Sequence, residues 1–405
     1  MVLRVEATTH LTGTQQSPEQ ESPKRGHQAR LVGLDVARGL AVFGMFAAHV
    51  MPPTYWPSSL ASGRAAALFA VLAGVSISLL SGGSRPHAGT RMRTSRVRIA
   101  VRAVLLFLLG LGLTTLQVPA MVILAFYGVL FLLSIPLLRL RAAALAILAA
   151  VLAVGAPLLS YVLRGGVETN RLGYTPDFGD FGSLDGFWTA VHSLLLTGAY
   201  PVLTWLPFLL TGMSLGRLDL LAVRGKLIAV GAGLAALGYG GSWIAMNPLG
   251  GHDVLLSTLP PGLPPKLLDA VLSSSMGTAP TTSPVWLLTA GAHSGTPFDI
   301  VGASGVAIAV IGACLFGQRL RGPLLPVSSV GALALTSYAG HLLVLKAVGA
   351  ERMGQLIAEH PYVPWLALMV GTAVLTIGWR VLLGRGPLEW ALHHASTAPA
   401  RLLAR

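Results

Sequence analysis

Long apolar runs separated by short polar connections dominate this chain, and they fix the class of fold. About ten of these runs are long enough to cross a bilayer, which takes roughly 20 mostly apolar residues in a helix. Only 11% of the residues are charged, whereas a soluble domain carries about 25%. The sequence therefore predicts an all-α polytopic membrane protein with about ten transmembrane helices. The predicted spans are 32–52, 65–82, 99–117, 120–138, 142–163, 199–216, 227–246, 297–316, 329–348 and 363–383.

Basic residues gather in the short connections between these runs and predict the orientation of the chain. The connection at 85–102 is the most basic, and the positive-inside rule places it in the cytoplasm together with both termini. The longer connections at 164–186 and 247–295 are then expected outside. The formal net charge of +13 follows from this distribution. The lipid bilayer is therefore the expected partner, and no nucleic acid is expected.

The chain divides into one membrane domain and two flanking tails. Residues 1–30 are rich in Gln, Glu, Ser and Pro and lack the apolar core of a signal peptide, which predicts a disordered cytoplasmic tail. Residues 31–390 are predicted to form a single transmembrane domain, with a short interfacial helix near 385–390. Residues 391–405 are predicted to form a second cytoplasmic tail.

The first predicted span carries three ionisable side chains, which are costly in a membrane unless they have a role. Asp35 and Arg38 are three residues apart on a helix and can pair. This pair either locks two helices together or leaves Arg38 to bind an anionic group that enters from the cytoplasm. Arg38 and His49 share a helix face about 16 Å apart. His49 is a candidate general base, because an imidazole near its ordinary pKa can take a proton from an alcohol or an amine.

The junction at 293–299 combines a helix start with two polar side chains that the helix start does not explain. Thr296 fits an N-cap, Pro297 fits position N1, and Asp299 fits position N3. His293 and Ser294 are predicted to face the outer side, where His49 is also expected. Because a helix start offers free N–H groups to developing negative charge, we take His293 as a second candidate catalytic residue. Ser294 and Thr296 are candidates for binding the substrate.

Polar residues in the ninth predicted span and beyond the first span are further candidates for binding a substrate. Tyr338 and His341 share one helix face, where they either join helices by hydrogen bonds or contact a substrate. Arg64 lies in the loop that follows His49. No motif of a serine hydrolase, an ATPase or a zinc enzyme occurs in the sequence, so no metal is expected.

The basic connection at 85–102 has two interpretations. Its arginines, Arg93 and Arg96 among them, either only fix the topology or also attract a polyanionic donor such as a nucleotide phosphate. With the second interpretation, Arg93 and Arg96 join Asp35 and Arg38 as candidates for binding that donor.

Four segments resemble one known family of membrane enzymes. RLVGLDVARGLAVFGMFAAHV, at 30–50, resembles the first span of the heparan-alpha-glucosaminide N-acetyltransferase-like proteins, with the bacterial YeiB-type branch looking most similar. ILAFYGVLFLLSIPL at 123–137, GALALTSYAGHLL at 331–343 and RGPLEW at 385–390 are similar to later parts of that branch. The last two lie in a C-terminal family region at about 225–390.

The resemblance implies an acyltransferase of the bacterial cytoplasmic membrane that takes an acyl group, expected to be acetyl, from cytoplasmic acyl-CoA. The acceptor would be a hydroxyl or amine at the outer face, on a small molecule, a glycan or a lipid-linked glycan. More distant acyltransferases that modify cell-surface glycans share a first span with Asp, Arg and a His, which corresponds to His49. The lysosomal member has Asn there and a catalytic His in the following loop. This chain has no His between 50 and 63, so it follows the glycan-acyltransferase pattern. A homodimer is one arrangement that stays open.

Residue positions and resemblance lead to one predicted mechanism. The donor phosphates bind near Arg38 and the basic connection, His49 deprotonates the acceptor, and His293 or the helix start at Thr296 polarises the carbonyl. A transporter or flippase that uses the same buried polar residues without chemistry is the alternative, and a non-catalytic scaffold is a third interpretation. Binding of acyl-CoA and release of CoA distinguish the first from the other two.

Overall fold

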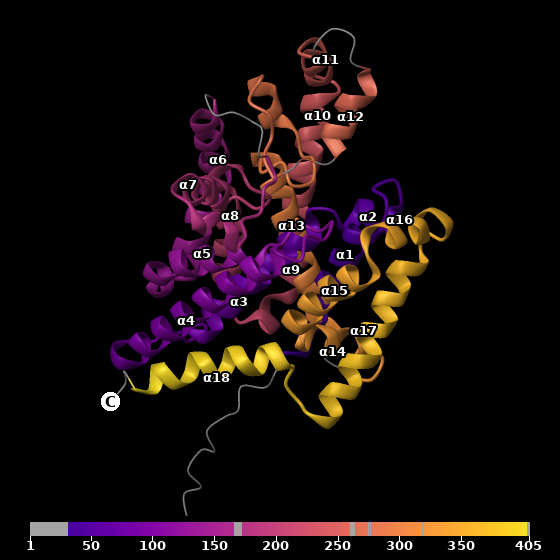
Figure 1. Ribbon diagram of the computed structural model, residues 1–405. Helices are drawn as coiled ribbons and strands as arrows, with labels where there is room; N and C mark the ends of the chain where they lie inside the picture. The colour runs from indigo at the N-terminus through magenta and orange to yellow at the C-terminus, as the bar shows by residue number, and fades with distance from the viewer. Residues whose placement is uncertain are drawn as a thin grey trace, which may run out of the picture. The chain divides into compact units, whose positions relative to one another are not determined.

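The computed structural model describes residues 31–165, 172–259, 264–273, 275, 277–317 and 320–402. Throughout these ranges the chain forms helices, with no β-strand, which confirms the predicted all-α class. The predicted tail at 1–30 lies outside the described residues. Figure 1 shows the order of the helices.

Seven helical segments are long and apolar enough to cross a membrane, counted over the described residues. Each of the seven overlaps one of the predicted spans. They are α1 (Val32–Val50), α2 with α3 (Trp56–Ala61 and Arg64–Leu80), α4 (Gly89–Thr114), α6 (Ala142–Arg164), α9 to α10 (Leu220–Met246, with α10 at Gly241–Met246), α13 (Pro297–Phe316) and α17 (Val363–Leu382).

Two helix pairs are bent, which changes the count of spans. The pair Leu184–Thr197 and α8 (Val202–Leu215) is bent by 53°, with its break at the start of the predicted span 199–216. α14 (Leu325–Ala332) meets α15 (Ala334–Val348) at 87°, inside the predicted span 329–348. The described chain thus has up to nine spans if each bent pair counts as one, and the helix at Leu124–Arg139, which begins with α5 (Leu124–Ser134), is shorter than a usual span. The predicted count of about ten is therefore not confirmed, although all ten predicted segments contain helix.

Most of the basic connection predicted at 85–102 is helical instead. α4 begins at Gly89, so Arg93, Arg96 and Arg102 lie on its first turns. Arginine is a good helix former, and its long side chain can reach polar surroundings from a helix end. The sequence changes from basic to apolar near residue 99, and this change shows where the apolar part of α4 begins. The helix itself begins earlier, at Gly89.

α1 packs inside the bundle against α14, α3 and α13 (Figure 1). Its closest neighbour is α14, and glycines allow the approach. A Cβ on Gly331 of α14 would collide with the carbonyl oxygen of Asp35, and a Cβ on Gly39 of α1 would collide with the carbonyl oxygen of Val327. The backbones touch at this crossing, as is usual where small residues line contacts between membrane helices.

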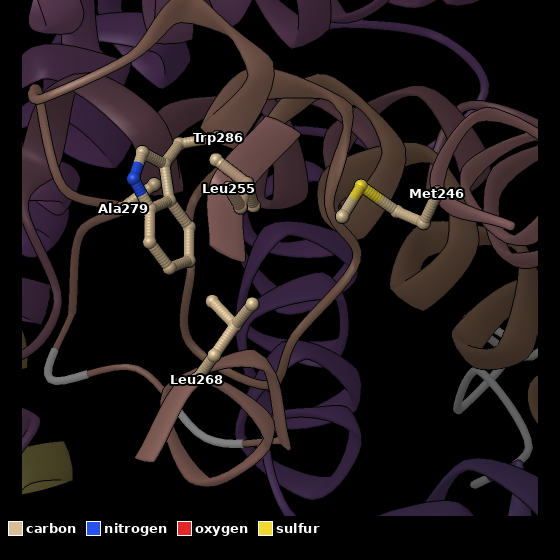
Figure 2. Close-up of a cluster of buried hydrophobic side chains, with 5 residues drawn as sticks. All are labelled: Met246, Leu255, Leu268, Ala279 and Trp286. Atoms are coloured by element: carbon tan, nitrogen blue, oxygen red, sulfur yellow. The ribbon is translucent and has the colours of Figure 1, made fainter. Parts of the chain in front are cut away.

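The region between α10 and α13 has a small apolar core of its own. α11 (Gly251–Ser257), α12 (Pro265–Ser273) and the short helix at Pro284–Leu288 surround it. Figure 2 shows its buried side chains, which are Met246, Leu255, Leu268, Ala279 and Trp286. Arg164, at the end of α6, donates a hydrogen bond to the carbonyl of Ala279 at 2.9 Å. These contacts fix the loop that carries His293.

The C-terminal segment is more regular than expected. α18 runs from Pro387 to Leu402, where the sequence predicted a short helix followed by a tail. It packs against α4 and lies along it in Figure 1. The contact brings α18 beside the arginines of α4, among them Arg102.

Arg217 joins four segments just after α8. It is 5% exposed, and its guanidinium donates to the carbonyls of Ser78, Gly83 and Leu138 and to the hydroxyl of Ser81. Buried acceptors that lose their donor cost about 1–3 kcal/mol each.

Arg217→Met is expected to lower the free energy of unfolding by at least about 2 kcal/mol, because it removes the donor that the carbonyls of Gly83 and Leu138 share. The measurement is the thermal midpoint of the purified protein in detergent. Arg141→Met, at an exposed position, is the control and should change the midpoint little. Equal midpoints for the two variants would contradict the role given to Arg217.

Candidate active site

Two histidines from different ends of the chain meet in the bundle. His49 lies near the end of α1, and its Nδ1 is 3.0 Å from Nε2 of His341 on α15. The rings are nearly parallel, with centroids 5.2 Å apart. The break before α15 turns that helix so that His341 faces α1, so the contact depends on a bend that the sequence did not predict.

The His341 side chain is deeply buried. It is 2% exposed and packs against the rings of Phe46 and Tyr338. Either imidazole can donate in the contact between His49 and His341, depending on the tautomer. In the tautomer where Nδ1 of His49 donates to Nε2 of His341, Nε2 of His49 carries the free electron pair.

A cavity of about 400 Å³ adjoins this pair, and we call it the His49 cavity. His293 and Tyr200 also line it, so the structure brings two of the predicted residues, His49 and His293, to one space. The remaining lining residues are Met45, Ala48, Pro53, Ser58, Ala61, Ser62, Gly63, Ala65, Ala66, Val118, Pro119, Ala120, Met121 and Thr175.

His293 is held in an unusual backbone conformation. Its φ is +60°, which is uncommon for a residue other than glycine, and its ring packs against those of Tyr200 and Trp205. Gly63 lies against the neighbouring backbone, where an added Cβ would be 3.2 Å from Cα of Ala292. Burial lowers the pKa of His293 to about 4, so its imidazole is neutral near pH 7 and can donate or accept a hydrogen bond.

The predicted helix start at Thr296 is confirmed, and the polar groups near it form hydrogen bonds with one another. Thr296 is the N-cap of α13, and its hydroxyl accepts from the N–H of Asp299 at 3.2 Å. Asp299 in turn accepts from the N–H of Gly295 at 3.1 Å. The hydroxyl of Ser294 lies 3.2 Å from that of Thr296. Neither Ser294 nor Thr296 lines the His49 cavity, so their described bonds are those of a helix cap.

A second cavity, of about 220 Å³, lies near the other end of α1, and we call it the Arg38 cavity. The predicted pairing is confirmed: Nη1 of Arg38 is 2.8 Å from Oδ1 of Asp35, and Nη2 donates to the hydroxyl of Ser76 at 2.9 Å. Arg102 and Glu389 line the same cavity, and neither was predicted as a site residue.

Arg93 and Arg96 do not line the Arg38 cavity. The helix that begins at Gly89 carries Arg102 to the cavity and leaves Arg93 exposed. Arg102 belongs to the same basic segment of the sequence. Arg102 could have been predicted as a residue of this cavity from the helical period, but only if the segment 85–102 had been predicted to be helical.

Arg64 and Tyr338 have partners inside the protein. Nε of Arg64 donates to the hydroxyl of Tyr239 at 3.0 Å, and its guanidinium lies over the same ring. The hydroxyl of Tyr338 accepts from the N–H of Ile123 at 3.3 Å. Neither residue lines the His49 cavity, although Gly63 and Ala65 beside Arg64 do.

Buried tyrosines lie where the linings of the two cavities come close. Tyr127 lines the Arg38 cavity, and its hydroxyl donates to the carbonyl of Ala66, a residue that lines the His49 cavity. Tyr200 lines the His49 cavity, and its hydroxyl donates to the carbonyl of Met121 at 3.3 Å. The bond between Tyr127 and Ala66 thus joins one residue of each lining. Among the described residues no group of three or more His, Cys, Asp or Glu side chains is placed to hold a metal ion.

About half of the chain is similar to a known family of membrane enzymes. Residues 30–229 match the model for the catalytic region of heparan-alpha-glucosaminide N-acetyltransferase. The matched segment contains His49, Arg38, Arg102 and Tyr127, whereas His341 and His293 lie beyond it. No curated protein matches the chain. Through this segment, which covers about half of its length, the chain belongs to the heparan-alpha-glucosaminide N-acetyltransferase family of membrane acetyltransferases.

Proposed function

We propose that this protein transfers an acetyl group from cytoplasmic acetyl-CoA to a hydroxyl or amine of an acceptor that arrives from the outer face. The observation that carries the proposal is the His49–His341 contact, 3.0 Å long, at the edge of a 400 Å³ cavity. The second cavity, at Arg38, provides the separate entrance that a transfer between two sides of a membrane requires. The family match supports the acetyltransferase chemistry.

The Arg38 cavity is the proposed site for part of the donor. Arg38 and Arg102 offer positive charge to its phosphates. The apolar lining, which includes Leu72, Phe69 and Phe131, suits the less polar arm that carries the thioester. The positive-inside rule places the arginine-rich start of α4 in the cytoplasm, where acetyl-CoA is found.

His49 is the proposed general base. Its Nδ1–H bond to His341 leaves Nε2 free to take the proton from the acceptor as the acceptor oxygen or nitrogen attacks the thioester carbonyl. The tetrahedral intermediate then collapses, the C–S bond breaks, and the proton on His49 passes to the departing thiolate of CoA. His293, neutral and lining the same cavity, is placed to donate a hydrogen bond to the oxyanion.

The acceptor is proposed to enter through a cavity of about 440 Å³ that shares Val118, Pro119, Ala120 and Thr175 with the His49 cavity. Gln117 and Asp177 add a side-chain amide and a carboxylate to its lining. Such groups bind hydroxyl and amino groups, which agrees with an acceptor that carries them.

The proposal is tested with acetyl-CoA in nanodiscs. Arg38→Ala is expected to weaken binding of acetyl-CoA at least about tenfold, a loss of about 1.4 kcal/mol, because a charge-assisted contact is removed. Arg38→Lys keeps the charge and should retain more affinity. Arg93→Ala, at an exposed position outside the cavity, is the matched control and should bind within about twofold of wild type.

The alternative of a transporter without chemistry draws support from the broken helix pair α14 and α15, since broken helices often line transport sites. The same experiment separates the two functions. Saturable binding of acetyl-CoA with release of CoA supports the transferase. No binding by the wild-type protein would contradict the acetyl-CoA proposal and favour transport.

A further inference from the structure

The start of α15 lies inside the bundle, because the span breaks at Leu333 just before it. The first N–H groups of a helix have no partner within it. Glu389 of α18 supplies the acceptors: its Oε1 accepts from the N–H of Leu335 at 2.8 Å and from that of Thr336 at 3.1 Å. Its Oε2 accepts from the hydroxyl of Thr336 at 2.5 Å. One carboxylate therefore takes three hydrogen bonds from the start of the helix that carries His341.

Glu389 also lines the Arg38 cavity together with Arg38 and Arg102. α18, on which it lies, packs against α4, and Nε of Arg102 donates to the hydroxyl of Ser396 at 3.3 Å. The carboxylate thus contacts the proposed donor site on one side and the start of α15 on the other.

We propose that Glu389 is a positioning residue, which holds α15 so that His341 orients His49, and that it connects the Arg38 cavity to the histidine pair. His341 lies five residues after Thr336, about 7.5 Å along the helix. A negative charge at a helix N-terminus is favourable, and hydrogen bonds to a carboxylate are strong. Release of the cap would let the start of α15 unwind and would loosen the His49–His341 contact. This inference rests on the proposed function of the two cavities.

The competing explanation is that Glu389 acts only through its charge, by balancing the arginines of the donor cavity. Glu389→Gln distinguishes the two. Glutamine keeps a carbonyl oxygen for the N–H groups of Leu335 and Thr336 but carries no charge. A cap therefore survives the change in large part, whereas a charge interaction does not.

The experiment compares Glu389→Ala, Glu389→Gln and the control Trp379→Phe. Trp379 of α17 donates to the carbonyl of Arg385, just before α18, at 2.9 Å, so the control loses a hydrogen bond near Glu389 in which no residue of α15 takes part. In Glu389→Ala, kcat is expected to fall at least about tenfold. Glu389→Gln should keep at least half of wild-type kcat, and so should the control. Thr336→Val, which removes one of the three bonds, is the milder variant where Glu389→Ala does not fold.

Hydrogen exchange over residues 334–341 provides a readout that does not depend on catalysis. The amides at the start of α15 should exchange at least about tenfold faster in Glu389→Ala than in wild type, and at the wild-type rate in Trp379→Phe. Unchanged exchange would overturn the proposal, as would a Glu389→Gln variant that loses both donor binding and kcat. If wild type released no CoA, the proposed function would fail, while faster exchange in Glu389→Ala would still support the positioning role.

Discussion

His49→Ala is expected to lower kcat for acetyl transfer about 100- to 10,000-fold, the usual contribution of a general base. That loss corresponds to about 3–5 kcal/mol of transition-state stabilisation. Binding of acetyl-CoA should stay within about twofold of wild type, because His49 does not line the Arg38 cavity. The measurement is CoA release with an acceptor amine or alcohol, beside direct donor binding. His192→Ala changes an exposed histidine of the segment before α8 and is the control.

The partner histidine allows a stricter form of this test. His341→Ala removes the ring whose Nε2 contacts Nδ1 of His49 and should lower kcat less than His49→Ala does. Because the two residues act as a unit, the double variant should be about as slow as His49→Ala alone. Additive losses, or a His49→Ala variant with wild-type kcat, would show that this pair is not the base.

Gly331→Val is expected to lower the free energy of unfolding by at least about 3 kcal/mol or to prevent the protein from folding. Overpacking of a flexible core costs about 1–3 kcal/mol, but here the added Cβ would collide with the backbone oxygen of Asp35, which cannot turn away. The helices α1 and α14 would have to separate. The measurements are the yield of monodisperse protein and its thermal midpoint in detergent.

Gly371→Val is the matched control for this change. Gly371 lies on α17, where an added Cβ meets no atom within 4 Å. The helix propensities of the two changes are the same, so a difference between the variants isolates the α1–α14 contact. If both variants had the midpoint of wild type, the close crossing of these helices would be refuted.

Local sequence patterns predicted the features that depend on neighbours in the chain. The Asp35–Arg38 pair follows from their spacing of three on a helix, and the cap at Thr296 follows from the order Thr-Pro-x-Asp. Hydropathy placed every apolar segment because burial in lipid requires about the same length of helix each time. It placed the start of α4 too late, since arginines continue that helix beyond the apolar layer.

The contacts that build the candidate site were not predictable from such patterns. The residue at the break, Leu333, is neither glycine nor proline, so its type gives no sign of a break. The carboxylate that stabilises the break belongs to Glu389, far along the chain. The sequence places His341 in a span and on the same helix face as Tyr338, three residues before it, but gives no sign of a contact with the first span. Its closest polar contact is His49, and only the bend of the helix pair reveals this.

The break at Leu333 also limits how much of a bilayer the second half of this span can cross. α15 has 15 residues and is therefore about 22 Å long, whereas the hydrocarbon layer of a bilayer is about 30 Å thick. Even if α15 stands upright, it spans only part of that layer, and α14 leaves it at 87°. A complete crossing by this helix pair therefore needs residues on both sides of the break.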